Sequence, residues 1–250
     1  MYLEERDIKN MKALSLTKKA IIKTFDRSLF KALLPSYIVL VIVSFFNSSQ
    51  IWSHLKKFQQ EPTNYSFTAD YWALTLLGSL VGLIFVVLVF SALDAIEKTN
   101  IFNFPKIKDL ATKTLRVLMV SIISYIFIML GLILFVIPGI LLSKRYIYVL
   151  NIAVEERLGI FESMKRSKEL SKKNGWSTYL SLIFISIPIY AINLPINFAF
   201  NPMVNPSATF FPYFLSNIII GYLCSIPFYS ALFYGYNDAK TLALKELESA

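Results

Sequence analysis

Charged residues divide this 250-residue chain into long apolar stretches separated by basic segments. A helix needs about 20 apolar residues to cross about 30 Å of hydrocarbon. Four stretches of sufficient length contain no Asp, Glu, Lys, Arg or His, at residues 32–53, 71–93, 117–143 and 174–237. The last stretch contains a run of turn-forming residues at 201–212, and it therefore predicts two helices.

A shorter segment, residues 140–156, completes a set of six predicted membrane helices. The other five lie at about residues 30–50, 71–93, 113–137, 176–199 and 211–235. Because backbone polar groups in lipid must be satisfied within their own segment, helices are expected even where the residues favour strands in water. The sequence thus predicts an all-α, polytopic membrane protein with six transmembrane helices.

The distribution of basic residues predicts the orientation. Of the 25 Lys and Arg residues, 21 lie before the first helix, in the second-to-third and fourth-to-fifth connections, or in the tail. The opposite side holds only Lys56 and Lys57. By the positive-inside rule both termini are cytoplasmic, which requires an even number of crossings. We expect one membrane domain, with a cytoplasmic amphipathic segment (1–29), a six-helix bundle (30–235) and a cytoplasmic C-terminal helix (236–250).

Composition narrows the chemistry. A hydrophobic content of 56% and a mean hydropathy of +0.56 argue against a water-soluble domain. One cysteine and one histidine exclude an internal disulfide and a histidine cage for a metal, and no cofactor is expected. The net charge is +9, and the basic residues lie beside the predicted membrane entry points. They form no nucleic-acid-binding motif. Anionic membrane lipids are the expected partner, and nucleic acid is not.

Two basic segments predict amphipathic helices at the membrane interface. The first, within residues 14–29, has most of Leu14, Ile21, Ile22, Phe25 and Leu29 on one face. The second, residues 157–176, sets Phe161 and Met164 among basic residues including Arg166, and ends with Trp176 at headgroup depth. The second segment is either a sensor of anionic lipid, a docking surface for a protein partner, or a solvated connector.

Lys144 and Arg145 interrupt the fourth predicted helix. Counted from Gly139 at the outer face, they lie roughly 8 to 9 Å deep. A cation there costs on the order of 3 kcal/mol unless it reaches an anionic or polar group. Arg145 is therefore expected either to bind an anionic group such as a lipid phosphate, or to extend with Lys144 to the outer headgroups as a structural anchor.

Prolines and glycines mark expected irregularities in the helices. Pro138 and Gly139 are expected to separate the third and fourth helices, and Pro188 and Pro227 to break the fifth and sixth near the midplane. Such breaks are typical either of a transport site or of packing kinks. Gly78 and Gly82 form a small-xxx-small pattern that favours close approach of another helix.

Residues 131–176 also carry a recognisable pattern. It comprises the Pro138-Gly139 pair, Arg145, Glu155, a helix with Ser163, Arg166 and Ser167, and Trp176. The pattern resembles the membrane domain found with some bacterial glycerophosphoryl diester phosphodiesterases and related free-standing bacterial membrane proteins. The resemblance implies a six-helix protein of the bacterial cytoplasmic membrane. This sequence departs from the family pattern at Asn151, where the family often has Pro. We find no catalytic phosphodiesterase domain in these 250 residues, so the resemblance does not imply hydrolase activity.

The predicted spans hold no set of acid, base and nucleophile. We therefore expect a non-enzymatic membrane protein that binds or moves lipid or another amphiphile, with an anionic-group contact at Arg145. The alternative is a structural or regulatory subunit that docks a cytoplasmic partner through residues 157–176 and 238–250.

Overall fold

The computed structural model describes residues 2–61, 68–99, 101–200 and 209–249, and all the regular structure in these ranges is α-helical. The prediction of an all-α protein is confirmed. The helices are α1 (Tyr2–Thr24), α2 (Arg27–Gln60), α3 (Ala69–Thr99), α4 (Ile107–Leu134), α5 (Val136–Arg145), α6 (Val149–Glu155), α7 (Ile160–Phe200) and α8 (Phe210–Glu248). The turn predicted at residues 201–212 lies mostly outside the described residues.

Five segments of the described chain are long and apolar enough to cross a membrane. They are α2, α3, α4, α7 and the stretch Val136–Glu155, which covers α5 and α6. These segments support a polytopic membrane protein. The sixth predicted crossing, residues 211–235, lies on α8, where part of the side chains fall outside the described residues. The count of six crossings stays a prediction.

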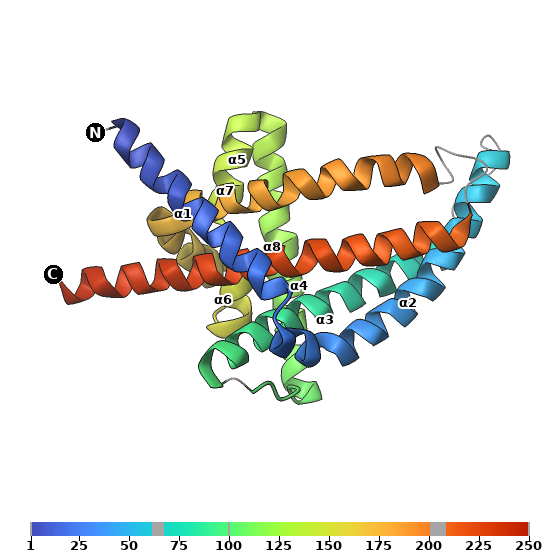
Figure 1. The fold of residues 1–250 in the computed structure, drawn as a ribbon, viewed down its shortest axis with the longest axis horizontal. Helices are drawn as coiled ribbons and strands as arrows, with labels where there is room; N and C mark the ends of the chain where they lie inside the picture. The colour runs from blue at the N-terminus through green and yellow to red at the C-terminus, as the bar shows by residue number, and fades with distance from the viewer. Residues whose placement is uncertain (1, 62–67, 100, 201–208, 250) are drawn as a thin grey trace.

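Figure 1 shows that the long helices do not all share one direction. Helices α2 and α3 pack as a pair, and α7 packs along α8. These four helices extend towards the same end of the molecule, whereas α4 runs steeply across them and α5 folds back along α4 (Figure 1). Helix α1 crosses α7 and α8 at the other end.

The break between α4 and α5 lies at Phe135, whose extended backbone (φ −162°, ψ 147°) reverses the chain. The predicted break at Pro138 and Gly139 was therefore misplaced. Pro138 lies in the first turn of α5, where the missing N–H has no helical partner to lose. Gly139 packs against α4 instead, since a Cβ on Gly131 would lie 3.2 Å from the Cα of Gly139.

Pro188 and Pro227 lie inside helices that are continuous there, so neither helix is interrupted, and the alternative of packing kinks stays a prediction. A proline removes one backbone hydrogen bond. Pro227 is buried among its neighbours, whereas Pro188 is exposed. Helix α7 is likewise continuous from Ile160, so the basic segment expected as a separate interface helix is the first part of the same helix as the fifth predicted span.

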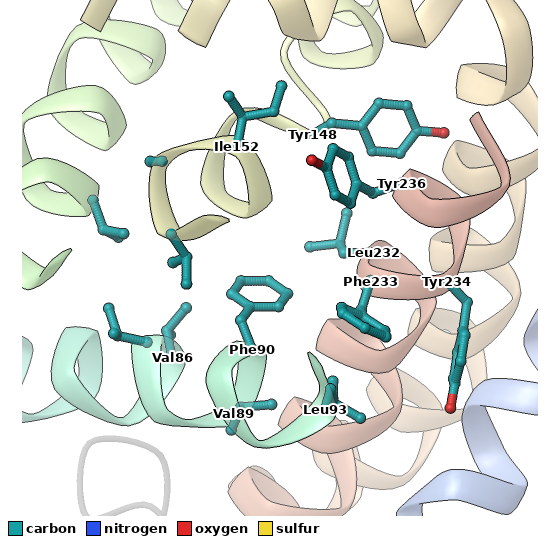
Figure 2. Close-up of a cluster of buried hydrophobic side chains, with 14 of the residues drawn as sticks. Val86, Val89, Phe90, Leu93, Tyr148, Ile152, Leu232, Phe233, Tyr234 and Tyr236 are labelled. Atoms are coloured by element: carbon teal, nitrogen blue, oxygen red, sulfur yellow. The ribbon is translucent and has the colours of Figure 1, made fainter. Parts of the chain in front are cut away.

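The buried core lies where α3, α6 and α8 meet. Figure 2 shows Phe90 and Leu93 of α3 facing Leu232 and Phe233 of α8, with Ile152 of α6 beside them. The rings of Tyr148 and Tyr236 lie near each other, with centroids 6.1 Å apart. This cluster joins the transverse α4–α6 region to the long helices.

Helix α7 packs through a face of small polar residues in addition to the buried apolar residues Met164, Leu170 and Ile185. The face is buried and comprises Ser163, Ser167, Ser171, Asn174, Thr178 and Ser181, spaced three or four residues apart. A Cβ on Gly235 of α8 would overlap Thr178, so the two helices approach closely there. The Oγ atoms of Ser181 and Thr17 lie 2.9 Å apart, which links α7 to α1.

The apolar face predicted on the N-terminal helix is exposed. Leu14, Ile21, Ile22 and Phe25 are exposed, whereas Leu29, the last residue of the predicted face, lies on α2 and is buried. A second face of α1 is buried, with Ala13, Leu16, Thr17, Ala20 and Thr24. The small side chains on that second face let α1 lie against α7 and α8.

Candidate functional site

A cavity of about 310 Å³ lies between α2, α3 and α8. Its walls are apolar, with hydroxyl groups between the apolar side chains. The apolar lining is Leu40, Val41, Phe85, Val86, Phe214 and Ile218, and the hydroxyl lining is Tyr37, Ser44, Ser48, Ser225 and Tyr229. The volume is at the lower end of the range for small-molecule pockets, about 300 to 1,000 Å³, and fits one chain or a small amphiphile.

Helical periodicity explains how the three helices build this lining. On α2 the residues Tyr37, Val41, Ser44 and Ser48 recur every three or four positions and share one face. Phe214, Ile218, Ser225 and Tyr229 share a face of α8 in the same way. Each helix therefore turns one partly polar stripe inward, while residues on the opposite face such as Phe46 stay exposed.

Gly82 of α3 opens the cavity. A Cβ added at Gly82 would meet no atom of the described residues within 4 Å, and Gly82 lines the cavity. At Gly78, in contrast, an added Cβ would overlap the side-chain amide of Asn47 on α2. The expected close approach of another helix therefore holds at Gly78 alone, and Gly82 provides space rather than contact.

One hydroxyl also joins two walls of the cavity. The Tyr37 hydroxyl donates a 3.0 Å hydrogen bond to the carbonyl oxygen of Ile218, which ties α2 to α8. On the α3 side, Phe85 lies 6.2 Å from the Tyr37 ring between centroids. The cavity is thus held open by specific contacts between its walls.

Lys144 and Arg145 do not line this cavity. The Lys144 ammonium lies 5.1 Å from the ring centroid of Trp176, and a Cβ on Gly175 would lie 3.1 Å from Lys144 Cε. The Arg145 side chain is exposed, and its carbonyl accepts a 2.9 Å hydrogen bond from Ser167 Oγ.

The contact between Lys144 and Trp176 corrects the expected depths. The sequence placed Lys144 near the outer face and Trp176 at the cytoplasmic face, yet they lie together. The reason is that α5 ends after 10 residues, and the chain turns at residues 146–148 against α7 instead of continuing straight.

The structure separates the residues expected on the interface segment. Phe161 is 71% exposed, whereas Met164 is buried in the core. Arg166 lies 3.6 Å from Glu156 and 3.8 Å from Glu169, measured between side-chain nitrogen and oxygen atoms. Trp176 is partly exposed beside Lys144.

A second, charged pocket of about 280 Å³ lies where α3, α4, α6 and α8 meet. Its acidic and basic groups pair with one another. Lys98 lies 2.7 Å from Asp94, and Lys240 lies 4.0 Å from Glu155. Arg157, which has a positive φ of 54°, reaches Asp109 at 3.7 Å. The pair of Lys240 and Glu155 ties α8 to the short helix α6, and this pairing favours a structural role over ligand binding.

Comparison with known proteins adds no family. No family model matches this chain, and no match was found among curated proteins or solved structures.

Sequence reasoning singled out the charged anomaly at Lys144 and Arg145 and missed the cavity. The available signal was the row Tyr37, Ser44 and Ser48 on one face of an otherwise apolar helix. On α8 the hydroxyl groups of Ser225 and Tyr229 line the opposite wall of the same cavity. Which rows face each other depends on helix packing, and the sequence alone does not give that.

Proposed function

We propose that this chain is a non-enzymatic, multi-pass protein of the bacterial cytoplasmic membrane that binds a single-chain amphiphile in the cavity between α2, α3 and α8. Both termini lie in the cytoplasm. The observation that supports binding is the combination of an apolar, hydroxyl-lined cavity with an unfilled space at Gly82.

The lining favours a neutral ligand. Among the described residues that line the cavity, none is charged. An ionised headgroup would be costly to bury there, whereas an alcohol or ester group can bond to the serine and tyrosine hydroxyls. The acyl chain would pack against the apolar walls. This proposal moves ligand binding away from Arg145, which lies outside the cavity.

Photocrosslinking tests this function. Dodecanol that carries a diazirine is added to the purified protein, and crosslinked peptides are identified by mass spectrometry. We expect labelling on the α2 and α8 faces that line the cavity, and competition by unlabelled dodecanol but not by dodecanoate.

A matched pair of variants gives the control. Gly82→Phe fills the cavity and is expected to abolish the competed labelling. Leu80→Phe adds an aromatic ring two residues away on an exposed position of the same helix and should leave labelling unchanged. Equal labelling of Gly82→Phe and the wild type would contradict amphiphile binding in this cavity.

A further inference from the structure

We propose that the α4–α5 hairpin enters the membrane from the cytoplasmic side, inserts its tip into that leaflet, and does not cross. The crossing helices are then α2, α3, α7 and α8, an even number that keeps both termini on one side. This inference does not depend on what occupies the cavity.

The outer membrane level is marked by aromatic residues on three helices. Trp52 of α2 lies 5.2 Å from Tyr213 of α8 between ring centroids. His54 of α2 lies 5.5 Å from Tyr71 of α3 between ring centroids and 3.3 Å from the Asp70 carboxylate. Tryptophan and tyrosine concentrate at membrane interfaces, so these residues define one boundary of the hydrocarbon.

The opposite boundary is marked by polar contacts at the other end of the same helices. Asn174 of α7 donates a 3.5 Å hydrogen bond to the carbonyl oxygen of Gly235 on α8. The Tyr234 hydroxyl donates a 3.3 Å hydrogen bond to Glu97 of α3. From Tyr213 to Gly235, α8 rises about 33 Å, which matches a hydrocarbon core of about 30 Å.

Lys144 lies at this second boundary. Its ammonium is over the ring of Trp176, two residues along α7 from Asn174. Trp176 and the basic residues before it, Lys172 and Lys173, have the composition of a cytoplasmic interface. The deep cation expected from the sequence is therefore a cation at headgroup level, where it carries no large insertion cost.

Helix length then limits how far the hairpin reaches. From Lys144 back to Val136, α5 rises only about 12 Å, less than half of the hydrocarbon core. Arg116, nine residues into α4, donates a 3.3 Å hydrogen bond to the carbonyl oxygen of Ala153, which ties α4 to the helix that follows α5. The tip at Phe135 therefore lies within about 12 Å of Lys144 along α5. Helix α4 is long enough to cross, but Figure 1 shows α4 and α5 running across the four long helices and not along them, so the hairpin does not follow their path through the membrane.

The tip has the surface that acyl chains require. Its five residues are apolar and 65% to 75% exposed, namely Ile133, Leu134, Phe135, Val136 and Ile137. Lys144 and Arg145, at the base of the hairpin, complement anionic headgroups. The surface of the α4–α5 hairpin therefore matches the cytoplasmic leaflet, with lipid acyl chains against its apolar tip and lipid headgroups against its basic end.

Cysteine labelling tests this topology. Single cysteines are placed in a Cys224→Ser background, and a membrane-impermeant maleimide is added to spheroplasts or to inside-out vesicles. We expect Arg145→Cys to label only in inside-out vesicles, like the cytoplasmic reporter Lys172→Cys and unlike the outer reporter Ser53→Cys. Labelling of Arg145→Cys or Phe135→Cys from outside would overturn the proposal and support six crossings.

Depth is measured at the tip itself. A bimane fluorophore on Phe135→Cys in nanodiscs should lose at least half of its emission when the lipids carry brominated acyl chains, whereas the same fluorophore on Lys172→Cys should lose little. Equal, weak quenching at both positions would show that the tip lies outside the membrane, and would also overturn the proposal.

Discussion

The hydroxyl of Tyr236 donates a 2.7 Å hydrogen bond to Oε1 of Glu156, and this bond joins α8 to the end of α6. Tyr236 is fully buried, and Glu156 also lies 3.6 Å from Arg166. Tyr236→Phe removes the donor and leaves the carboxylate partly unsatisfied, so the variant is expected to lose about 1 to 3 kcal/mol of stability. The midpoint of thermal unfolding in detergent measures the loss.

Tyr234→Phe is the matched control for this bond. The Tyr234 hydroxyl makes a longer bond of 3.3 Å to Glu97, so its loss should lower the unfolding midpoint less. In a Glu156→Gln background the effect of Tyr236→Phe should shrink. An equal effect in both backgrounds would mean that the hydrogen bond contributes little.

Ser167 is expected to matter more than a neighbouring buried serine on the same helix. Its Oγ accepts a 3.2 Å hydrogen bond from the Tyr148 amide and donates to the Arg145 carbonyl, so it bridges the turn between α5 and α6. Ser167→Ala leaves both backbone groups without this partner, at a cost of about 1 to 3 kcal/mol. Ser171 bonds only within α7, to the Lys168 carbonyl, and Ser171→Ala should change the unfolding midpoint little. Equal shifts would refute the bridging role.

Gly235 is expected to resist substitution. A side chain there overlaps Thr178, and overpacking of this kind costs about 1 to 3 kcal/mol. Gly235→Ala should therefore lower the unfolding midpoint, and Thr178→Ala should recover part of the loss. Gly159→Ala is the control, because its added Cβ meets only the flexible end of Glu162 at 3.3 Å. If the two substitutions change the unfolding midpoint additively in the double variant, Gly235 and Thr178 are not in energetic contact.

Asp26 gives a prediction about pH. Its carboxylate accepts hydrogen bonds from Lys23, from the Ser28 hydroxyl and amide, and from the Leu29 amide at the start of α2. The ion pair with Lys23, followed by the bonds from Ser28, holds the pKa of Asp26 well below its ordinary value of 3.8. A carboxylate with a lowered pKa contributes stability above its ordinary pKa, and that contribution is lost as pH falls below 3.8 towards the folded-state pKa.

Comparison of the wild type with Asp26→Asn isolates this contribution. Asparagine keeps the helix cap but loses the ion pair, so the wild type should unfold at a higher temperature at pH 7 and pH 5. The difference should narrow between pH 4 and pH 3. A difference that is independent of pH would exclude Asp26 as its source. Asp26→Ala removes the cap as well and should cost about 1 kcal/mol at neutral pH.

The sequence predicted best where one physical rule dominates. Helices α2 and α3 contain the predicted residues 30–50 and 71–93, because length and apolarity alone define such segments. Around Pro138 several effects compete, and the turn formed at Phe135 instead. There the close contact between Gly131 and Gly139, which the local sequence does not predict, accompanies the folding back of α5 along α4.

The candidate site was less accessible to sequence reasoning. The depth expected for Lys144 assumes one straight helix over residues 140–156, whereas α5 ends at Arg145 and the chain turns, which brings Lys144 beside Trp176. Gly82 looked like a contact residue because Gly78, four positions earlier, is one. Whether a glycine meets a neighbour or an empty space depends on the helix opposite, which the local pattern does not specify.

Because α7 is continuous from Ile160 to Phe200, it should tolerate insertions and deletions poorly. Its first half is tied to the tail through Lys173 and Glu246, and its second half to α1 through Ser181 and Thr17. One residue inserted between these two ties would rotate one half by about 100° relative to the other, so both could not form together. Relatives of this chain should therefore vary in the identity of α7 residues far more than in their number.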